Sequence, residues 1–357
     1  MPEVTPEAVP GPVLQDLRAR LRAYRRVPLP PGFGWERGVD GDFLAELVAH
    51  WADHYDWRVH EERILALPWT LAGGLRLIHQ RAATRGVPVV LLHGWPDSVL
   101  RFEKVLPLLA DLNVVVPALP GFPFAAPVAR GGMSAAAMAE TVAAALAELG
   151  YDRYVVSAGD VGCDVAEVLA AAYPDRVAAL HLTDVSQYRF LVDPPADLSP
   201  AEQAYVRSGH RWQRQEGGYM REQATKPHTL AVGLGDSPAG LAAWLLEKLR
   251  TWTDCGGDVT TVFTREELLT WITAYWVTGS IGTSFTPYAE AGLRPGPIVA
   301  PTAFTIFPKD LVNAPREFAA RFFDVRSWVE EPRGGHFGAW ECPEQYVAGV
   351  RAAASLA

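Results

Sequence analysis

From about residue 74, short apolar runs alternate along the chain with longer amphipathic stretches. Short runs rich in Val, Leu and Ala predict buried strands, and the stretches between them predict helices. The predicted strands are 75–80, 87–93, 113–117, 154–159 and 179–184, with helices around 99–110, 134–149 and 162–173. Strands that alternate with helices indicate a mostly parallel sheet with right-handed crossovers.

The alternation stops between roughly 186 and 295, where the pattern is helical, rich in Trp and Tyr, and punctuated by Pro and Gly. Two further apolar runs, 299–307 and 325–331, then resume the strand pattern. A helical insertion between two halves of one sheet predicts a lid over the strand ends, where ligands bind. We therefore expect a core formed by residues 74–185 and 296–357, with residues 186–295 as the lid.

Residues 1–73 predict a helical extension that packs on the core and the lid. Its first helix, 13–26, interleaves Arg and Leu and is stopped by Pro28. The second is expected to begin at an Asp42 cap, and its apolar positions form one stripe. That stripe consists of Phe43, Leu44, Leu47, Val48, Trp51 and Tyr55. The extension has too few core residues to fold alone.

The composition is that of a globular protein with a sizeable core, because 49% of its 357 residues are hydrophobic and 12 are Trp. A net charge of -9 without a Lys/Arg cluster beside stacking aromatics argues against nucleic-acid binding. No apolar run reaches the ~20 residues of a membrane span, and the three cysteines have neither metal nor disulfide spacing. We expect a cytoplasmic protein with a small-molecule partner, no membrane partner, no cofactor and no metal; a homo-oligomer is left open.

The stretch YVVSAGDVGC, residues 154–163, brings an acidic residue to the end of a predicted strand. Ala158 and Gly162 flank Asp160 in the order small, any, nucleophile, any, small, which is typical of the nucleophile elbow of the α/β-hydrolase fold. Small residues are needed because larger side chains there would collide with the neighbouring strand and helix. The nucleophile is usually Ser and is Asp160 here. A turn with an Asp helix cap is the alternative interpretation.

A nucleophile needs a base, and the base needs an acid that orients it. His336 follows two glycines in a loop after the last predicted strand and is the candidate base. Asp310, in the run FPKD just past a strand, is the candidate acid. The resulting order of nucleophile, acid and histidine is that of the α/β-hydrolase fold. Asp324, in a turn, and Glu331, at a strand end closer to the histidine, are lower-ranked rivals for the acid.

The run HGWP, residues 93–96, follows an early apolar strand. A loop there can direct the backbone N–H of Trp95 toward the site, opposite the N–H of Val161 from the elbow. Two such donors form an oxyanion hole. The alternative is a Gly-Pro turn beside a Trp that only packs in the core.

A carboxylate nucleophile forms an alkyl ester by displacement at a saturated carbon, and water must then cleave that ester at the carboxyl carbon. The candidate substrates are therefore epoxides and haloalkanes, whereas esterase chemistry is disfavoured. Opening an epoxide produces an alkoxide that needs a proton from a group neutral at pH 7, such as a Tyr hydroxyl. The predicted lid is rich in Tyr.

These residues resemble the microsomal-type epoxide hydrolases of the α/β-hydrolase superfamily over nearly the whole chain. The matching runs are YDWR at 55–58, HGWP, the elbow, GGYMREQATKPHTL from Gly217, DSPAGLAAWLLEK from Asp236, FPKD and RGGHF. By position, the resemblance implies Asp160 as nucleophile, His336 as base and Asp310 as acid.

The resemblance also implies that Tyr219 and Tyr288 protonate the epoxide oxygen, with Tyr275 as the nearest competitor of Tyr288. The implied reaction uses water to convert an epoxide to a vicinal diol without a cofactor. Asp97 stands where the family commonly has Gly, and Val161 where it usually has Trp; these departures leave substrate size and scope open.

Two alternatives remain. A haloalkane dehalogenase would share the Asp, His and acid, but it often carries a halide-gripping Trp at the position of Val161. A homologue without catalysis would bind a ligand or a partner through the same fold.

Overall fold

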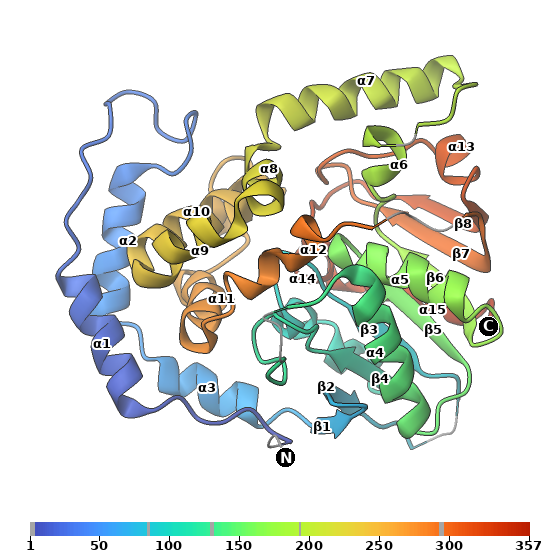
Figure 1. Cartoon of the computed structure of the whole chain (residues 1–357), viewed down its shortest axis with the longest axis horizontal. Coiled ribbons are helices and arrows are strands. Elements are labelled where there is room, and N and C mark those ends of the chain that lie inside the picture. The colour runs from blue at the N-terminus through green and yellow to red at the C-terminus, as the bar shows by residue number, and fades with distance from the viewer. Residues whose placement is uncertain (1–3, 84–85, 129–131, 193, 293–295) are drawn as a thin grey trace.

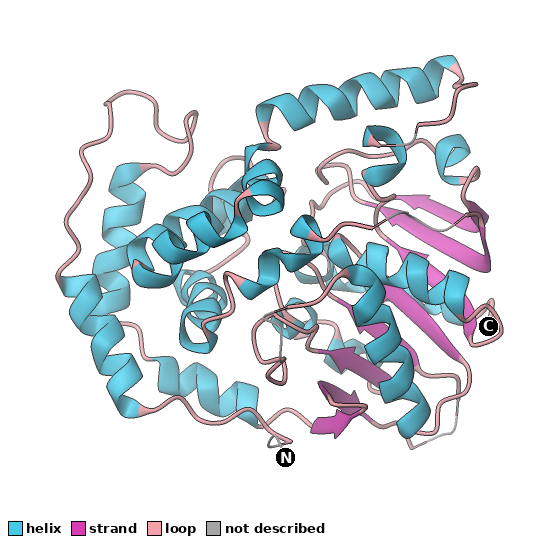
Figure 2. Cartoon of the chain, viewed as in Figure 1, coloured by secondary structure: helices cyan, strands magenta, loops and turns pink. Residues whose placement is uncertain are grey.

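The computed structural model describes residues 4–83, 86–128, 132–192, 194–292 and 296–357. It contains an eight-stranded sheet, which lies on the right in Figures 1 and 2. The strands are β1 (Trp69–Ala72), β2 (Leu75–Gln80), β3 (Val89–Leu92), β4 (Val114–Pro117), β5 (Tyr154–Ala158), β6 (Val177–Leu182), β7 (Ile298–Ile306) and β8 (Phe323–Glu330). Their order across the sheet is β1-β2-β4-β3-β5-β6-β7-β8. β2 pairs antiparallel with β1 and β4, and the remaining neighbours pair in parallel. The predicted mostly parallel sheet is therefore confirmed.

The central strands are buried on both faces, as their continuous apolar sequences require. Every residue of β3, β4, β5 and β6 is buried. Helices that contact this sheet complete the core (Figure 1). They are α4 (Ala135–Glu148), α5 (Val161–Ala172) and α15 (Pro343–Ala354), with α14 (Gly338–Glu341) leading into α15.

The prediction of one helix over residues 99–110 is wrong. This stretch forms two short 3₁₀ turns, η1 (Val99–Phe102) and η2 (Leu106–Leu109). Pro107 lacks the N–H that a continuous α-helix needs at this position, and its ring would collide with the preceding turn. The stretch therefore breaks into two tight turns instead of one helix.

The N-terminal extension contains α1 (Gly11–Arg22), α2 (Gly41–Asp53) and α3 (Trp57–Leu65). The predicted cap of α2 is wrong, because Asp40 and not Asp42 is the N-cap. The Asp40 carboxylate accepts the N–H groups of Asp42 and Phe43, each at 2.9 Å. The predicted apolar stripe is buried or half-buried along its length. α1 and α2 contact each other and α10 (Pro238–Thr251), and α3 contacts α11 (Arg265–Thr278) (Figure 1).

The segment between β6 and β7 is helical, and its described residues contain no strand (Figure 2). Residues 193 and 293–295 of this expected lid lie outside the described residues. Its helices are α6 (Tyr188–Leu191), α7 (Pro200–Gln215), α8 (Gly218–Thr225), α9 (Pro227–Asp236), α10 (Pro238–Thr251), α11 (Arg265–Thr278) and α12 (Thr286–Ala289), with turns η3 (Val259–Thr261) and η4 (Thr283–Phe285). A short helix, α13 (Arg316–Ala319), joins β7 to β8.

Within the described ranges, no individual helix has the length and apolarity needed to cross a bilayer. α9 and α10 meet those two criteria only when taken together, across a bend of 115°.

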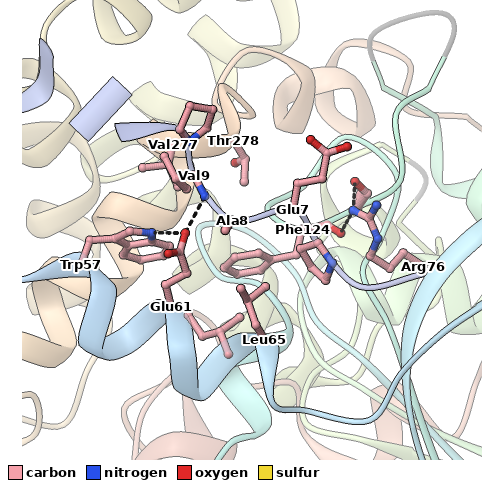
Figure 3. Close-up of a pocket in the computed structure, with 14 residues that line it drawn as sticks. Glu7, Ala8, Val9, Trp57, Glu61, Leu65, Arg76, Phe124, Val277 and Thr278 are labelled. Carbon is pink, nitrogen blue, oxygen red and sulfur yellow. Dashed lines mark hydrogen bonds between the residues drawn. The ribbon is translucent and has the colours of Figure 1, made fainter. Parts of the chain in front are cut away.

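A pocket of about 220 Å³ lies where the N-terminal segment meets α3, the end of α11 and the loop after β4 (Figure 3). The Glu61 carboxylate closes one side by accepting the Val9 N–H at 2.6 Å and the Trp57 Nε1–H at 3.0 Å. On the other side, Arg76 donates to the Phe124 carbonyl at 3.0 Å. None of the predicted site residues lines this pocket, so the candidate site lies elsewhere.

Candidate active site

Asp160 occupies a strained turn between β5 and α5. Its φ of 56° and ψ of -132° lie in a region that residues other than Gly rarely adopt. A Cβ on Gly162 would lie 2.6 Å from the Leu92 carbonyl oxygen, which explains the small residue at that position. The Asp160 side chain makes no capping hydrogen bond to α5, so the helix-cap interpretation is wrong. The turn instead projects the carboxylate beyond the end of the strand.

Two backbone donors point at this carboxylate. The Trp95 N–H donates to Asp160 Oδ1 at 2.8 Å, and the nearby Val161 N–H also favours the charged carboxylate and lowers its pKa. A Cβ on Gly94 would lie 2.4 Å from Oδ1, so the loop after β3 approaches this closely only because residue 94 has no side chain. Burial raises the pKa of Asp160, and the positive charge of His336 and the two N–H groups offset part of that rise.

His336 and Asp310 come from adjacent loops at the carboxyl ends of β8 and β7. Lys309 and Gly335 form a parallel bridge between these loops. Beside that bridge, His336 Nδ1 lies 2.7 Å from Asp310 Oδ1. Nε2 lies 3.5 Å from Asp160 Oδ2 and has no hydrogen-bond partner among the described residues. The structure thus brings the predicted nucleophile, base and acid together.

The carboxylates hold His336 in its charged form. Burial lowers the pKa of His336, but the Asp310 carboxylate and then the Asp160 charge outweigh this effect and raise the pKa to about 9. For Asp310, burial raises the pKa, yet the His336 charge and the Leu311 N–H reverse the effect and lower it below its ordinary value. Asp310 is therefore an anion beside an imidazolium at neutral pH.

The two rival acids lie away from this arrangement. Asp324 is on β8 and accepts a hydrogen bond from Arg326 at 2.9 Å. Glu331 lines a separate pocket with Tyr205 and Pro308.

A pocket of about 340 Å³ opens onto Asp160. Tyr219 of α8 and Tyr288 of α12 line it, together with apolar side chains that include Leu191 and Met220. The lid therefore covers the nucleophile with two phenols. Burial, and then the nearby Asp160 charge, raises the pKa of each hydroxyl well above its ordinary value. Both phenols remain protonated at neutral pH and are able to donate.

The structure separates Tyr288 from its competitor Tyr275. The Tyr288 hydroxyl is buried and has no hydrogen-bond partner of normal geometry within the described ranges. The Tyr275 hydroxyl donates to the backbone carbonyl of Asp97 at 2.9 Å, and Tyr275 does not line the pocket. Of these two phenols, Tyr288 is therefore the one that lines the pocket with Asp160.

Sequence reasoning assigned no role in the site to three residues beside it. Asp184, just past β6, lines the pocket and accepts a hydrogen bond from Cys163 Sγ at 2.6 Å. Burial and the Asp310 charge raise the pKa of Asp184 to about 7. Asp97 and Arg101 form a buried ion pair behind the site. Their spacing of four residues directly after the HGWP run is the signal that could have revealed them.

The acidic residues near the site do not form a metal centre. In the part of the chain that the structure describes, no group of three His, Cys, Asp or Glu side chains is arranged to hold a metal ion. The site instead combines a buried carboxylate, two amide donors, an imidazole with its acid, and two phenols. This set is suited to forming an ester on Asp160 and then hydrolysing it.

Comparisons with known proteins identify the family of this chain. Residues 4–102 match the family described as epoxide hydrolase N terminus, and residues 87–233 match the family described as alpha/beta hydrolase fold. A candidate epoxide hydrolase of Stigmatella aurantiaca is 34% identical over 96% of this chain and 82% of its own length. Juvenile hormone epoxide hydrolase 2 of Ctenocephalides felis is 30% identical over 94% of this chain and 82% of its own.

The fold also matches that of a solved relative. The structure of Aspergillus niger epoxide hydrolase superimposes with a TM-score of 0.86 and 27% sequence identity. The match covers 99% of this chain and 97% of the Aspergillus niger chain.

Proposed function

The chain belongs to the microsomal-type epoxide hydrolase family of the α/β-hydrolase fold, and on this premise we propose that it converts an epoxide to a vicinal diol through a covalent ester on Asp160. The geometry of the site supports a reaction in two steps, each with its own set of groups.

In the first step, one Asp160 carboxylate oxygen attacks an epoxide carbon and the carbon–oxygen bond of the ring breaks. The oxygen leaves as a developing alkoxide, and Tyr219 and Tyr288 donate hydrogen bonds and a proton to it. Their raised pKa values support this role, because a phenol that stays neutral near pH 7 is a competent acid for an alkoxide. The product is a hydroxyalkyl ester of Asp160.

In the second step, His336 Nε2 takes a proton from water, and the water oxygen attacks the ester carbonyl carbon. Asp310 holds the imidazole and stabilises the imidazolium that forms. The N–H groups of Trp95 and Val161 stabilise the oxyanion. Collapse of this intermediate breaks the ester bond, and the departing diol oxygen takes the proton back from His336. The proton left on the Asp160 carboxyl group returns through solvent to the tyrosinate formed in the first step, which restores the carboxylate and both phenols.

One observation carries the proposal: the pocket that opens onto Asp160 is lined by two buried phenols of the lid. A carboxylate nucleophile alone suits epoxides and haloalkanes equally. Paired proton donors serve an oxygen leaving group, because a departing halide needs no proton. Val161 has no side-chain N–H, whereas the dehalogenase alternative calls for a halide-gripping donor at this position.

The test is to trap the intermediate. His336→Gln, incubated with styrene oxide, is expected to gain the mass of one substrate on the Asp160 peptide and to release almost no diol. Asp160→Asn is the matched control and should gain no mass. A folded His336→Gln variant without the mass gain would show that the mechanism is wrong.

Oxygen-18 water separates this route from direct attack of water on the epoxide. In a single turnover with excess wild-type enzyme, the diol should carry ordinary oxygen and the label should enter the Asp160 carboxylate. Chloride release from a chloroalkane without diol formation from an epoxide panel would favour the dehalogenase. Absence of both activities would favour a non-catalytic homologue.

A further inference from the structure

Asp97 and Arg101 form an ion pair that is shielded from solvent behind the catalytic residues. Each residue is only 1% exposed, and Arg101 Nη1 lies 2.5 Å from Asp97 Oδ2. A buried ion pair contributes little net stability unless further hydrogen bonds satisfy both partners. The remaining bonds of this pair lead to two different parts of the site.

The Asp97 carboxylate contacts the loop that supplies one oxyanion donor. Its Oδ1 accepts the Gly94 N–H at 2.8 Å, and Gly94 immediately precedes Trp95. The Trp95 N–H, in the same loop, donates to Asp160 Oδ1. Asp97 thereby fixes the orientation of the loop at the residue before the donor.

Arg101 contacts the loop that supplies the base. Its Nη2 donates to the His336 backbone carbonyl at 2.6 Å, across 235 positions of sequence. The His336 N–H donates in turn to the Trp252 carbonyl at 2.8 Å. The backbone of the base is thus held at both its N–H and its carbonyl, while Asp310 holds its ring.

We propose that Asp97 and Arg101 are a positioning pair that aligns the oxyanion donor Trp95 with the base His336 for ester hydrolysis. This inference rests on the proposed function, because it concerns the second step of that reaction. Neither member of the pair lines the pocket that opens onto Asp160, so each acts through a loop that it holds.

The charge state of the pair is consistent with this role. Burial raises the pKa of Asp97, but the charge of Arg101 and the contact with His93 outweigh it and lower the pKa to about 2. Arg101 is an obligate cation beside it. The pair therefore stays ionised, and the connection between the two loops stays intact, across the pH range in which His336 titrates.

The pair should affect the two steps unequally. Alkylation uses the Asp160 oxygen and the lid phenols, which Asp97 and Arg101 do not contact. Hydrolysis uses His336 and the backbone donors, which they hold. A purely structural role would instead reduce both steps together, in proportion to the fraction of folded enzyme.

The test measures both rate constants in the variants Arg101→Met, Arg101→Lys and Asp97→Asn, by rapid acid quench and mass analysis of the Asp160 peptide with styrene oxide. We expect Arg101→Met to slow hydrolysis by about 10–100-fold and to leave alkylation nearly unchanged. For comparison, removal of one oxyanion-hole donor lowers the catalytic rate constant by about 10²–10³-fold. The ester should then accumulate. Arg101→Lys should recover part of the hydrolysis rate, since it keeps a cation and donors. Asp97→Asn keeps the size of the side chain and should shift the ratio of the two rate constants in the same direction.

Arg76→Met is the matched control. Arg76 is also a buried guanidinium that donates to a backbone carbonyl, that of Phe124 at 3.0 Å, but it lies outside the site. Its variant should keep the wild-type ratio of the two rate constants. An unchanged ratio in both Arg101→Met and Asp97→Asn would overturn the inference. Failure of the proposed function would look different, since His336→Gln would then form no ester at all.

Discussion

The imidazole Nδ1 of His336 lies 2.7 Å from Asp310 Oδ1, beside the parallel bridge that joins their two loops. A carboxylate at this position accepts the Nδ1 proton, so the ring presents Nε2 to the nucleophile and to the water that must attack the ester. The acid therefore acts on the reaction through the orientation and the charge of the base.

Asp310→Asn should slow ester hydrolysis by about 10²–10⁴-fold, because an amide stabilises the imidazolium poorly and is able to fix the wrong tautomer. Alkylation should change little, since it requires no proton transfer by His336. Single-turnover mass analysis of the Asp160 peptide would show the ester forming at the wild-type rate and then persisting. Asp324→Asn removes a carboxylate that binds Arg326 instead and should behave like wild type. Equal hydrolysis rates in these two variants would contradict the assignment of the acid.

The lid phenols should control the alkylation step, in which Asp160 opens the epoxide. We expect Tyr219→Phe and Tyr288→Phe each to slow alkylation by about 10–100-fold and the double variant to slow it further, since general acid catalysis contributes 10²–10⁴-fold. Tyr275→Phe loses the hydrogen bond to the Asp97 carbonyl outside the pocket and should retain alkylation within a few-fold of wild type. The measurement is the rate of ester formation under single-turnover conditions. A larger loss in Tyr275→Phe than in Tyr288→Phe would reverse the choice between them.

Local signals in the sequence predicted the parts of the site that local geometry determines. The elbow was recognisable because residue 162 lies against the Leu92 carbonyl oxygen. Only a glycine fits there, and the motif therefore requires a small residue at this position. The positions of Asp310 and His336 followed from strand ends, because the carboxyl ends of parallel strands share one edge of a sheet.

Contacts between distant segments could not be read in the same way. No feature of the sequence around Arg101 indicates a contact with His336. Only the folded chain brings the two residues together. The choice of Tyr288 over Tyr275 likewise depended on which lid helix faces the pocket.

Strand β1 was not among the predicted strands. It is short, and its ends are buried while its middle is only half-buried, so it lacks the alternation that marks a strand. The cap of α2 was misplaced by two residues because Asp40 and Asp42 are equally good caps by composition.

Substitutions of two glycines should show whether the elbow has room for a larger side chain. Gly162→Ala would place a Cβ 2.6 Å from the Leu92 carbonyl oxygen, and we expect it to destabilise the fold by about 1–3 kcal/mol or more, as overpacking does. Gly233→Ala is the matched control, because it lies in helix α9 with nothing within 4 Å of the added Cβ. That variant should be about 0.5–1 kcal/mol more stable than wild type, since Ala favours a helix over Gly. Urea unfolding checks both, and equal stability of the two variants would contradict the crowding at the elbow.

The pH dependence of ester hydrolysis should report the charges around His336. In the free enzyme its pKa is raised to about 9, because Asp310 and Asp160 outweigh the effect of burial. Alkylation converts Asp160 to a neutral ester and removes one of these charges, so the pKa of His336 should fall. A base must be neutral, so hydrolysis should rise with pH through a midpoint below 9 and then level off. Asp310→Asn removes a larger contribution and should lower the midpoint further. Following decay of the preformed ester from pH 5 to 10 measures both midpoints, and a rate that is independent of pH would contradict the role of His336 as the base.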